Sequence, residues 1–538
     1  MSANPDTAAP TGRKKPAQGK ERSDAALGHE SQNSPAPTGR NMPAQGNALG
    51  HASQNTSSPE EVNGIRRLPA AWRWAKMSEV CSRVQDGTHF SPKEQTRSGD
   101  FKYITAKNIK HWGLDLTELT YVPEHVHREI YKRCNVEKGD VLYIKDGVTT
   151  GIATVNTLDE EFSLLSSVAL LKPRRDILDS LFLKYYLNSP EGFQNMTGQM
   201  TGTAIKRLIL QKIKAAVVPV APLPEQRRIV AEIEKQFTRL EAGAAALRRV
   251  QTNLKRYRAA VLKAACEGQL VPTEAELAKT GNQKAKIETG EVLLARILTE
   301  RRQNWQGRGQ YKEPATPDIR NAARVTEGWA WASVDQLADD TMIGLDRGRA
   351  QQSDDSAAGV PYIKMNNVTM DGRVRCDELV FVPASREEAT RFAVQDGDIL
   401  FNTRNSKELV GKVGLVRNSP PGAIYNNNLM RIRVPADVLP AFVALQMCSH
   451  EFRQRMELVK KATTSVAAVY SKDLLPLAIA LPPLAEQTRI VAEVDRRLSV
   501  VDELEAVVSA NLQRATRLRQ SILQKAFTGQ LLEAERSP

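Results

Sequence analysis

The sequence predicts two tandem domains of mixed α/β (α+β) structure, each followed by one long α-helix. The first observation is a phrase that occurs twice: APLPEQRRIVAEIEKQF begins at Ala221, and LPPLAEQTRIVAEVDRRL begins at Leu481. Glu225 aligns with Glu486, 261 residues later, without a gap. A repeat of this length indicates duplication of a whole domain-plus-helix unit rather than a solenoid of small repeats. The second observation is that short β-branched runs alternate with Gly, Asp and Asn turns before each copy, as strands do.

Composition sets the broad class of the protein. The chain has 538 residues, 41% of them apolar and 25% charged, which suits a globular protein with two or three cores. No apolar run approaches the roughly 18 residues that a membrane-spanning helix needs, and the N-terminus has no secretory apolar core. Five separated cysteines without a CxxC pair predict a cytoplasmic location and no zinc site. The net charge of +13 is compatible with a polyanion partner but does not identify one.

The chain divides into seven expected segments. Residues 1–62 contain few large aliphatic side chains and repeat the phrase APTGR, so we expect a disordered tail that folding does not need. Proline before each long helix and glycine after it mark the helix boundaries. The remaining segments are 63–221 for the first domain, 222–270 for the first long helix, 271–325 for a linker with a short helix over 291–305, 326–482 for the second domain, 483–532 for the second long helix and 533–538 for a C-terminal tail.

The two predicted domains share one frame. Trp72 has its counterpart in Trp329, and YITAKNI, beginning at Tyr103, has its counterpart in YIKMNNV, beginning at Tyr362. VEKGDVLYIKDG and VQDGDILFNTRN form another such pair. Identity between the halves is low except at turn and core positions. The frame is therefore repeated while the exposed residues differ.

Each long helix carries an apolar stripe. Apolar residues recur at steps of three or four between positions 229 and 265, and again between 490 and 526, which is the spacing of a coiled-coil seam. About 40 residues at a rise of 1.5 Å make a rod roughly 60 Å long. A lone helix with such a stripe would be poorly soluble. Each helix therefore needs a partner, and the other copy is the nearest candidate.

These features together resemble the specificity (S) subunit of type I restriction–modification enzymes. The resemblance covers about residues 68–533, and rests on PLPEQRRIVAEI and PPLAEQTRIVAEV at the helix starts, GQL at both helix ends, DGTHFSP from Asp86, and RILTERRQNW…YKEP in the linker. It implies two target-recognition domains that each read one half of a split, asymmetric DNA sequence. It also implies that the two helices pack as an antiparallel coiled coil with pseudo-two-fold symmetry and set the distance between the half-sites.

The resemblance also implies the partners. The chain would bind double-stranded DNA, hold two modification (methyltransferase) subunits and join restriction subunits with translocase and nuclease activities. No catalytic residue, metal site or cofactor is expected on this chain. S-adenosylmethionine, ATP and magnesium would be used by the other subunits.

Candidate DNA contacts lie where the repeat keeps its frame but changes its polar residues. Lys and Arg suit phosphates, while Arg, Lys, Asn, Gln, Ser and Thr suit base edges; turn geometry is the alternative role for such residues. In the first domain the candidates are Thr88, His89, Lys107, Asn108, Lys110, Lys145, Thr149, Thr150, Thr201, Thr203, Lys206 and Arg207. In the second domain they are Lys364, Asn366, Asn367, Asn402, Arg404, Asn405, Lys407, Thr463, Thr464 and Ser465. The second domain shows no counterpart of DGTH: its stretch at residues 338–348 reads ADDTMIGLDRG.

The helix starts and the GQL ends are candidate subunit contacts. The glutamates lie in the first helical turn, where a carboxylate favours the positive end of the helix dipole. The glutamines are harder to assign to packing, so capping and contact with the opposite domain or a partner subunit both stay open. The candidates are Glu225, Gln226, Arg228, Gln269, Glu486, Gln487, Arg489 and Gln530.

Two rival classes fit the sequence less well. A self-sufficient DNA methyltransferase or nuclease would need motifs that are missing: there is no GxxxxGK[ST] loop, and neither Pro-Pro pair, at 420–421 and 482–483, belongs to a methyltransferase tetrad. A non-DNA coiled-coil scaffold would need neither the basic charge nor two diversified domains.

Overall fold

The structure is a computed structural model that describes residues 68–198, 200, 208–280, 288–307, 309–320 and 324–532. The predicted N-terminal tail and residues 533–538 lie outside this range, as do the candidates Thr201, Thr203, Lys206 and Arg207. Within these residues, no helix has the length and apolar character needed to cross a membrane.

Domain 1 is built on a four-stranded antiparallel sheet with the strand order β2-β10-β7-β8. A second sheet, β6-β3-β9, contains the parallel pair β3–β9, and β1 pairs with β11. The elements are β1 (Arg73–Lys76), α1 (Met77–Val80), β2 (Cys81–Asp86), β3 (Phe101–Ile104), β4 (Ile109–Lys110), β5 (Gly113–Leu114), β6 (Thr120–Val122), α2 (Glu124–Arg133), β7 (Val141–Ile144), β8 (Ala153–Val155), β9 (Ser163–Leu164), β10 (Val168–Pro173), α3 (Ser180–Leu187), α4 (Pro190–Thr197), α5 (Leu210–Ala215) and β11 (Val217–Val220).

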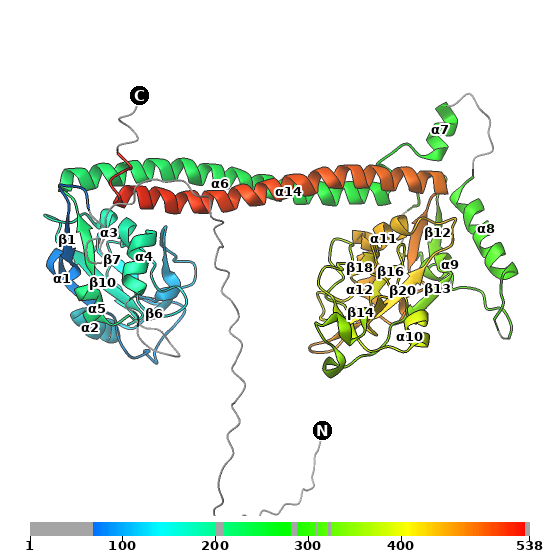
Figure 1. The fold of residues 1–538 in the computed structure, drawn as a ribbon, viewed down its shortest axis with the longest axis horizontal. Coiled ribbons are helices and arrows are strands. Elements are labelled where there is room, and N and C mark those ends of the chain that lie inside the picture. Colours follow the sequence, from blue (N-terminus) through cyan, green and yellow to red (C-terminus); the bar gives the residue numbers. More distant parts are fainter. Residues whose placement is uncertain are drawn as a thin grey trace, which may run out of the picture. The chain divides into compact units, whose positions relative to one another are not determined.

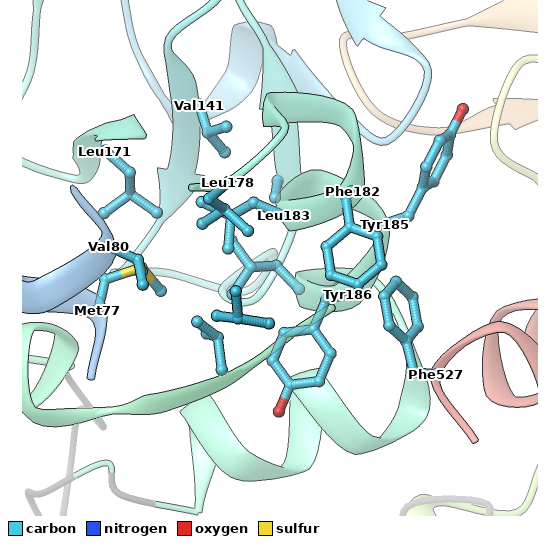
Figure 2. Packing of buried hydrophobic residues seen from close by; sticks show 14 of the residues in the cluster. Met77, Val80, Val141, Leu171, Leu178, Phe182, Leu183, Tyr185, Tyr186 and Phe527 are labelled. Atoms are coloured by element: carbon cyan, nitrogen blue, oxygen red, sulfur yellow. The ribbon is translucent and has the colours of Figure 1, made fainter. Parts of the chain in front are cut away.

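The main sheet of domain 1 separates two cores. Val141 and Leu171 face each other across β7 and β10 and belong to one core, while Leu142 and Leu170 face each other and belong to the other. This is the alternation that strand geometry imposes on a sheet covered on both faces. In the first core, Phe182 and its neighbours on α3 cover the sheet (Figure 2).

Domain 2 repeats this topology. Its sheets have the orders β13-β20-β16-β18, β15-β14-β19 and β12-β23, and β14–β19 is again the parallel pair. A further sheet, β17-β22-β21, has no counterpart among the described residues of domain 1. The elements are β12 (Ala330–Ser333), α9 (Val334–Leu337), β13 (Asp340–Ile343), β14 (Val360–Ile363), β15 (Val380–Val382), α10 (Arg386–Arg391), β16 (Ile399–Asn402), β17 (Arg404–Asn405), β18 (Val413–Leu415), β19 (Ile424–Tyr425), β20 (Leu429–Arg433), α11 (Pro440–Cys448), α12 (His450–Val459), β21 (Lys461–Ala462), β22 (Ala467–Ala468), α13 (Ser471–Leu474) and β23 (Ala478–Leu481).

The two long helices, α6 (Leu223–Cys266) and α14 (Leu484–Phe527), run side by side in opposite directions (Figure 1). Arg258 of α6 pairs with Asp502 of α14, and Arg519 of α14 pairs with Glu241 of α6 at 2.8 Å. Under the repeat, position 258 aligns with 519 and 241 aligns with 502, so the two ion pairs are related by the pseudo-two-fold axis. The predicted fold class, including the antiparallel helix pair, is confirmed.

Each long helix begins at its own domain and ends at the other. At the end of α14, the ring of Phe527 lies 5.1 Å from that of Phe182 and 5.3 Å from that of Tyr186, inside the core of domain 1 (Figure 2). At the end of α6, Val261 and Ala265 pack with Trp329 of domain 2. Both domains are therefore attached to both helices.

The GQL phrase ends both long helices for a physical reason. Gly268 and Gly529 have φ angles of +66° and +82°, a region that side chains with a Cβ rarely adopt. Leu531 then returns into the core of domain 1, where it is 3% exposed. The glycine stops the helix and the leucine anchors its end.

The linker contains two helices, α7 (Glu274–Thr280) and α8 (Gly290–Gln303). The sequence predicted one helix over residues 291–305, where α8 lies, and missed α7. Leu293 and Ile297 of α8 are 0% and 3% exposed and belong to the core of domain 2. The second linker helix is therefore part of that domain.

Candidate nucleic-acid interface

The DGTH turn of domain 1 gathers basic side chains around one carboxylate. Asp86 is 1% exposed and lies 3.1 Å from Arg133 Nη2, 3.2 Å from His89 Nε2 and 3.5 Å from Lys145 Nζ. The side chains of Arg133 and His89 remain 47% and 57% exposed. Asp86 therefore holds cationic or polar groups at the surface. Sequence reasoning missed Arg133, whose signal was its place in the basic last turn of α2.

The same turn is present in domain 2. A Cβ at Gly87 would lie 1.9 Å from the Leu164 carbonyl oxygen, and a Cβ at Gly344 would lie 2.3 Å from that of Tyr425. The residue after each glycine forms a parallel bridge, to Leu165 in domain 1 and to Asn426 in domain 2. The expectation that DGTH has no counterpart is therefore wrong for the backbone. Only glycine permits this close approach, and the other letters have become I, L and D.

The loop after β7 exposes fewer of the predicted residues than expected. The Lys145 side chain is 9% exposed and donates from Nζ to Asp146 at 2.9 Å. The Thr150 hydroxyl donates to the Gly147 carbonyl at 2.7 Å. Thr149 and its neighbour Val148 are exposed at the tip. The tip of this loop, rather than its base, is available to a ligand.

In domain 2 the structure brings two candidate loops together. β17 pairs with β22, which sets Arg404 and Asn405 beside the β21–β22 hairpin. The tip of this hairpin carries Thr463, Thr464 and Ser465, all exposed. These residues form one polar surface from segments about 60 positions apart in the sequence.

Three asparagines predicted as DNA contacts are internal instead. Asn108 donates to the carbonyls of Asp115 and Glu118 at 3.1 and 3.2 Å. Asn367 and Asn402 likewise donate to main-chain carbonyls, at 3.1 Å. The three residues are 5%, 6% and 0% exposed. Their amides hold turns in place, and these predictions are corrected.

Three further candidates are buried in the same way. Thr88, Lys145 and Thr150 are 4%, 7% and 9% exposed, and their polar atoms are bonded within domain 1. They too are corrected to roles inside the domain. The exposed candidates, which stay predictions, are His89, Lys107, Thr149, Asn366, Arg404, Lys407, Thr463, Thr464 and Ser465, with Lys110, Lys364 and Asn405 partly exposed.

Comparison with known proteins shows which proteins the chain is similar to. Residues 69–246 match the family model described as "Type I restriction modification DNA specificity domain". The chain is 25% identical over 474 residues to the type I restriction enzyme EcoKI specificity subunit of Escherichia coli (strain K12), covering 86% of this chain and 90% of that one. It is 23% identical over 496 residues to the EcoBI specificity subunit of Escherichia coli, covering 89% and 91%.

The chain is therefore similar to type I restriction–modification specificity subunits along most of its length, and residues 69–246 match their DNA specificity domain. The resemblance read from the repeated motifs is confirmed. A chain in a solved structure, from work on the complex assembly and conformational transition of the type I R-M system, aligns with a TM-score of 0.56 at 20% identity. It covers 87% of this chain and 100% of that one, and supports the fold.

In each copy, the glutamate and glutamine of the repeated phrase attach the long helix to its own domain. The Trp72 indole donates to Glu225 at 3.1 Å, and the Trp329 indole donates to Glu486 at 2.7 Å. Glu486 also accepts from the Glu274 amide at 3.0 Å. Burial raises the pKa of Glu486, and these two hydrogen bonds oppose that shift. The repeated tryptophan and the repeated glutamate therefore recur because they bind each other.

The repeated glutamine also attaches each long helix to its domain. Gln226 accepts from the Asp179 amide at 2.8 Å and donates to the carbonyls of Ile177 and Ala221 at 2.9 and 2.7 Å. Gln487 accepts from the Leu439 amide at 2.8 Å and donates to the Pro482 carbonyl at 2.9 Å. Both side chains tie a long helix to the segment that precedes α3 or α11.

The predicted subunit contacts therefore divide into three groups. Gln226 and Gln487 are 0% exposed and Glu486 is 1% exposed, so for these three the prediction does not hold. Glu225 is partly buried against Trp72, and Arg489 pairs with Glu274 at 2.5 Å. The three that remain exposed are Arg228, Gln269 and Gln530.

Replacing Gln487 by Leu is expected to destabilise the attachment of α14 to domain 2. The change leaves the Leu439 amide and the Pro482 carbonyl buried without their partner, at a cost of about 1–3 kcal/mol for each group. Gln226→Leu should act in the same way on domain 1. Chemical denaturation of the full chain measures both effects, and Arg228→Ala, a change of an exposed residue two positions after Gln226 in α6, is the control. If the Gln487→Leu and Gln226→Leu variants were as stable as Arg228→Ala, these glutamines would not hold the long helices to the domains.

Proposed function

We propose that this chain is the DNA-sequence specificity subunit of a type I restriction–modification complex. It binds a bipartite, asymmetric DNA target through two recognition domains and scaffolds the modification and restriction subunits. The observation that carries the proposal is that two copies of one backbone frame present different exposed polar residues at matching loops. Both copies are attached to one antiparallel helix pair.

The exposed residues of the loops suit DNA. His89, Arg133 and Lys107 in domain 1, and Arg404 and Lys407 in domain 2, supply basic or polar groups for phosphates and base edges. Different side chains on the same frame read different bases, which is what an asymmetric target requires. Binding is expected to weaken as salt rises, because phosphate contacts release counterions.

The helix pair suits the scaffolding role. Val250 and Tyr257 of α6 and Val500, Leu504 and Val507 of α14 are large apolar residues with 43–56% exposure. An apolar band of this kind on a rod of charged helices is typical of a protein–protein docking surface. The proposal assigns it to two modification subunits, in keeping with the two-fold character of the helix pair.

The cofactors are proposed to act elsewhere in the complex. S-adenosylmethionine would bind the modification subunits, and ATP and magnesium would bind the restriction subunits, all in the cytoplasm. Within the described residues no three His, Cys, Asp or Glu side chains are grouped so that they could hold a metal ion. We infer that this chain selects the site and the other subunits carry out the chemistry.

The purified chain is expected to show neither methyl transfer nor DNA cleavage. The reason is that its sequence has no phosphate-binding GxxxxGK[ST] loop and no Asn/Asp-Pro-Pro-aromatic tetrad. Transfer of a labelled methyl group to duplex DNA, and cleavage of a plasmid with added ATP and magnesium, are the measurements. Turnover by rigorously pure protein would contradict the assignment.

Co-expression with a modification subunit tests the proposed function directly. The expected result is methylation at two short half-sites separated by a gap of fixed length and free sequence, mapped by sequencing of methylated adenines. The same cells without this chain are the control. Methylation of one continuous sequence, or methylation that does not depend on this chain, would exclude the proposal.

A further inference from the structure

Domain 1 contains a cavity of about 900 Å³ next to the candidate loops. Its lining includes Arg97, Tyr103, Lys107, Ser167 and one carboxylate, that of Glu118. Arg97 and Lys107 are exposed at the surface, and the cavity wall holds two cationic side chains against one carboxylate. This volume lies within the range of binding sites for small groups.

Two of the residues that line this cavity carry hydroxyls that have no hydrogen-bond partner within the described part of the chain. Tyr103 is 2% exposed, and its hydroxyl is unpaired. The Ser167 hydroxyl is also buried and unpaired. A buried polar group without a partner costs about 1–3 kcal/mol, so two of them in one wall call for an explanation.

In domain 2, the tyrosine at the position of Tyr103 has hydrogen-bond partners for its hydroxyl. Tyr362 is the counterpart of Tyr103: Tyr362 pairs in parallel with β19, and Tyr103 pairs in parallel with β9. The Tyr362 hydroxyl donates to the Leu345 carbonyl at 2.6 Å and accepts from Asn426 Nδ2 at 2.9 Å. The tyrosine of domain 2 therefore has both of its partners inside the domain.

Domain 1 has lost both of these partners. The position of Asn426 is taken by Leu165, which has no polar side chain. The position of the Leu345 carbonyl is taken by the Thr88 carbonyl, which accepts from the Ser166 amide at 2.8 Å and not from the Tyr103 hydroxyl. Domain 1 therefore has the same tyrosine as domain 2 but not the two groups to which its hydroxyl would bond.

We propose that this cavity is a DNA phosphate-binding site of domain 1, in which Tyr103 and Ser167 donate to a backbone phosphate flanked by Lys107 and Arg97. The inference rests on the proposed function and names a contact for the first half-site. Its role is to fix the position of domain 1 on the duplex, because phosphate contacts set register while base contacts set sequence.

The chemistry of the wall favours a phosphate over a base edge. Tyrosine and serine hydroxyls, lysine and arginine all donate, and a phosphate only accepts. Burial raises the pKa of Tyr103 to about 12, so its hydroxyl stays protonated and remains a donor. Phosphates also project from the outside of the duplex, whereas a base edge lies within a groove and would have to leave the stack to enter a cavity.

The test compares Tyr103→Phe with Tyr362→Phe in the full chain bound to its modification subunits. The probe is a fluorescent duplex that contains the sequence which the unaltered complex methylates. The affinity for this duplex, the Tm and the sequence that each variant methylates are measured. Tyr103→Phe should bind about tenfold more weakly, because a hydrogen bond to a charged group is lost. Its Tm should be unchanged or higher, because the free protein loses an unpaired buried hydroxyl and no bond.

Tyr362→Phe is expected to show the opposite pattern. Its Tm should fall, because Asn426 and the Leu345 carbonyl lose their partner, while the affinity for the first half-site should not change. Lys107→Ala should reduce the slope of log affinity against log salt by about one, as for one lost phosphate contact. Both half-site sequences should stay the same in all three variants.

Three results would overturn the inference. They are an affinity of Tyr103→Phe within twofold of the unaltered complex, a fall in its Tm like that of Tyr362→Phe, and a change in the bases of the first half-site. The last of these would indicate base reading rather than phosphate binding. If the unaltered complex itself does not bind the duplex, the proposed function fails, and that failure is seen before any variant is made.

Discussion

Exchange of domain 2 together with α8 for the same segment of another specificity subunit is expected to change one half-site and leave the other unaltered. The reason is that the exposed loops of each domain, such as Arg404 and the tip at Thr464, come from that domain alone. The segment to exchange is 288–481, which ends with β23 and leaves α6 and α14 intact. Sequencing of methylated adenines after co-expression with the modification subunit is the measurement.

The structure decides where this exchange must begin. Leu293 and Ile297 of α8 are buried in the core of domain 2, so a graft of residues 325–480 alone would set foreign core residues against them. Mismatched core packing costs about 1–3 kcal/mol for each overpacked site and more where a cavity forms. The short graft is therefore expected to be less stable than the long one. The donor must also supply tryptophan at position 329, because Glu486 stays behind.

If each domain reads its own half-site, exchange of one domain cannot change both half-sites. If both half-sites changed together, the bases would be selected by the assembly as a whole and not by separate domains. The reciprocal exchange of domain 1 is the matched control, and it should change the other half-site. Thermal unfolding of each hybrid shows whether a lost half-site reflects reading or folding.

The large features of the fold could be predicted from the sequence because they depend on local pattern and repetition. Proline before Leu223 and Leu484, and the glycines at 268 and 529, mark helix ends within a few residues. The apolar steps required a partner for each helix, but the antiparallel direction came from the family resemblance. α7 was missed because EAELAKT is short, mostly polar and buries no residue.

The candidate interface could be predicted only in part, because burial depends on what surrounds a residue. Asn366 and Asn367 are neighbours of the same type, yet one is exposed and the other is 6% exposed and bonded to the Glu378 carbonyl. No sequence pattern separates them. Tyr103 and Tyr362 also align in sequence, and only the partners contributed by distant strands distinguish them.

Insertion of four helix-forming residues after Gln251 of α6 is expected to keep both half-sites and to lengthen the gap between them. Four residues lengthen a helix by about 6 Å, and base pairs lie about 3.4 Å apart, so the gap should grow by about one or two base pairs. The insertion also turns one end of the helix by about 40° beyond a full turn. Flexing of DNA and protein would absorb this angle at a modest cost.

The position of the insertion follows from the helix pair. Gln251 lies between Glu241 and Arg258, which form the two symmetry-related ion pairs with α14. Lengthening α6 alone shifts one ion pair by a turn, so methylation should be weaker than with the unaltered chain. A second variant adds four residues after Val508 of α14 as well. This insertion falls between the positions of Asp502 and Arg519, restores both ion pairs and should recover methylation at the widened gap.

Sequencing of the methylated sites shows whether the helix pair sets the distance between the half-sites or only holds the two domains. Insertion of the same four residues after Gly309, in the linker, is the control and should leave the gap as it is, because the linker does not belong to the helix pair. Both domains are attached to both helices, through Phe527 at one end and Val261 at the other. Any lengthening of the pair must therefore move the domains apart. A gap that does not change with the double insertion, or half-sites that change their bases, would show that the helices do not set the distance.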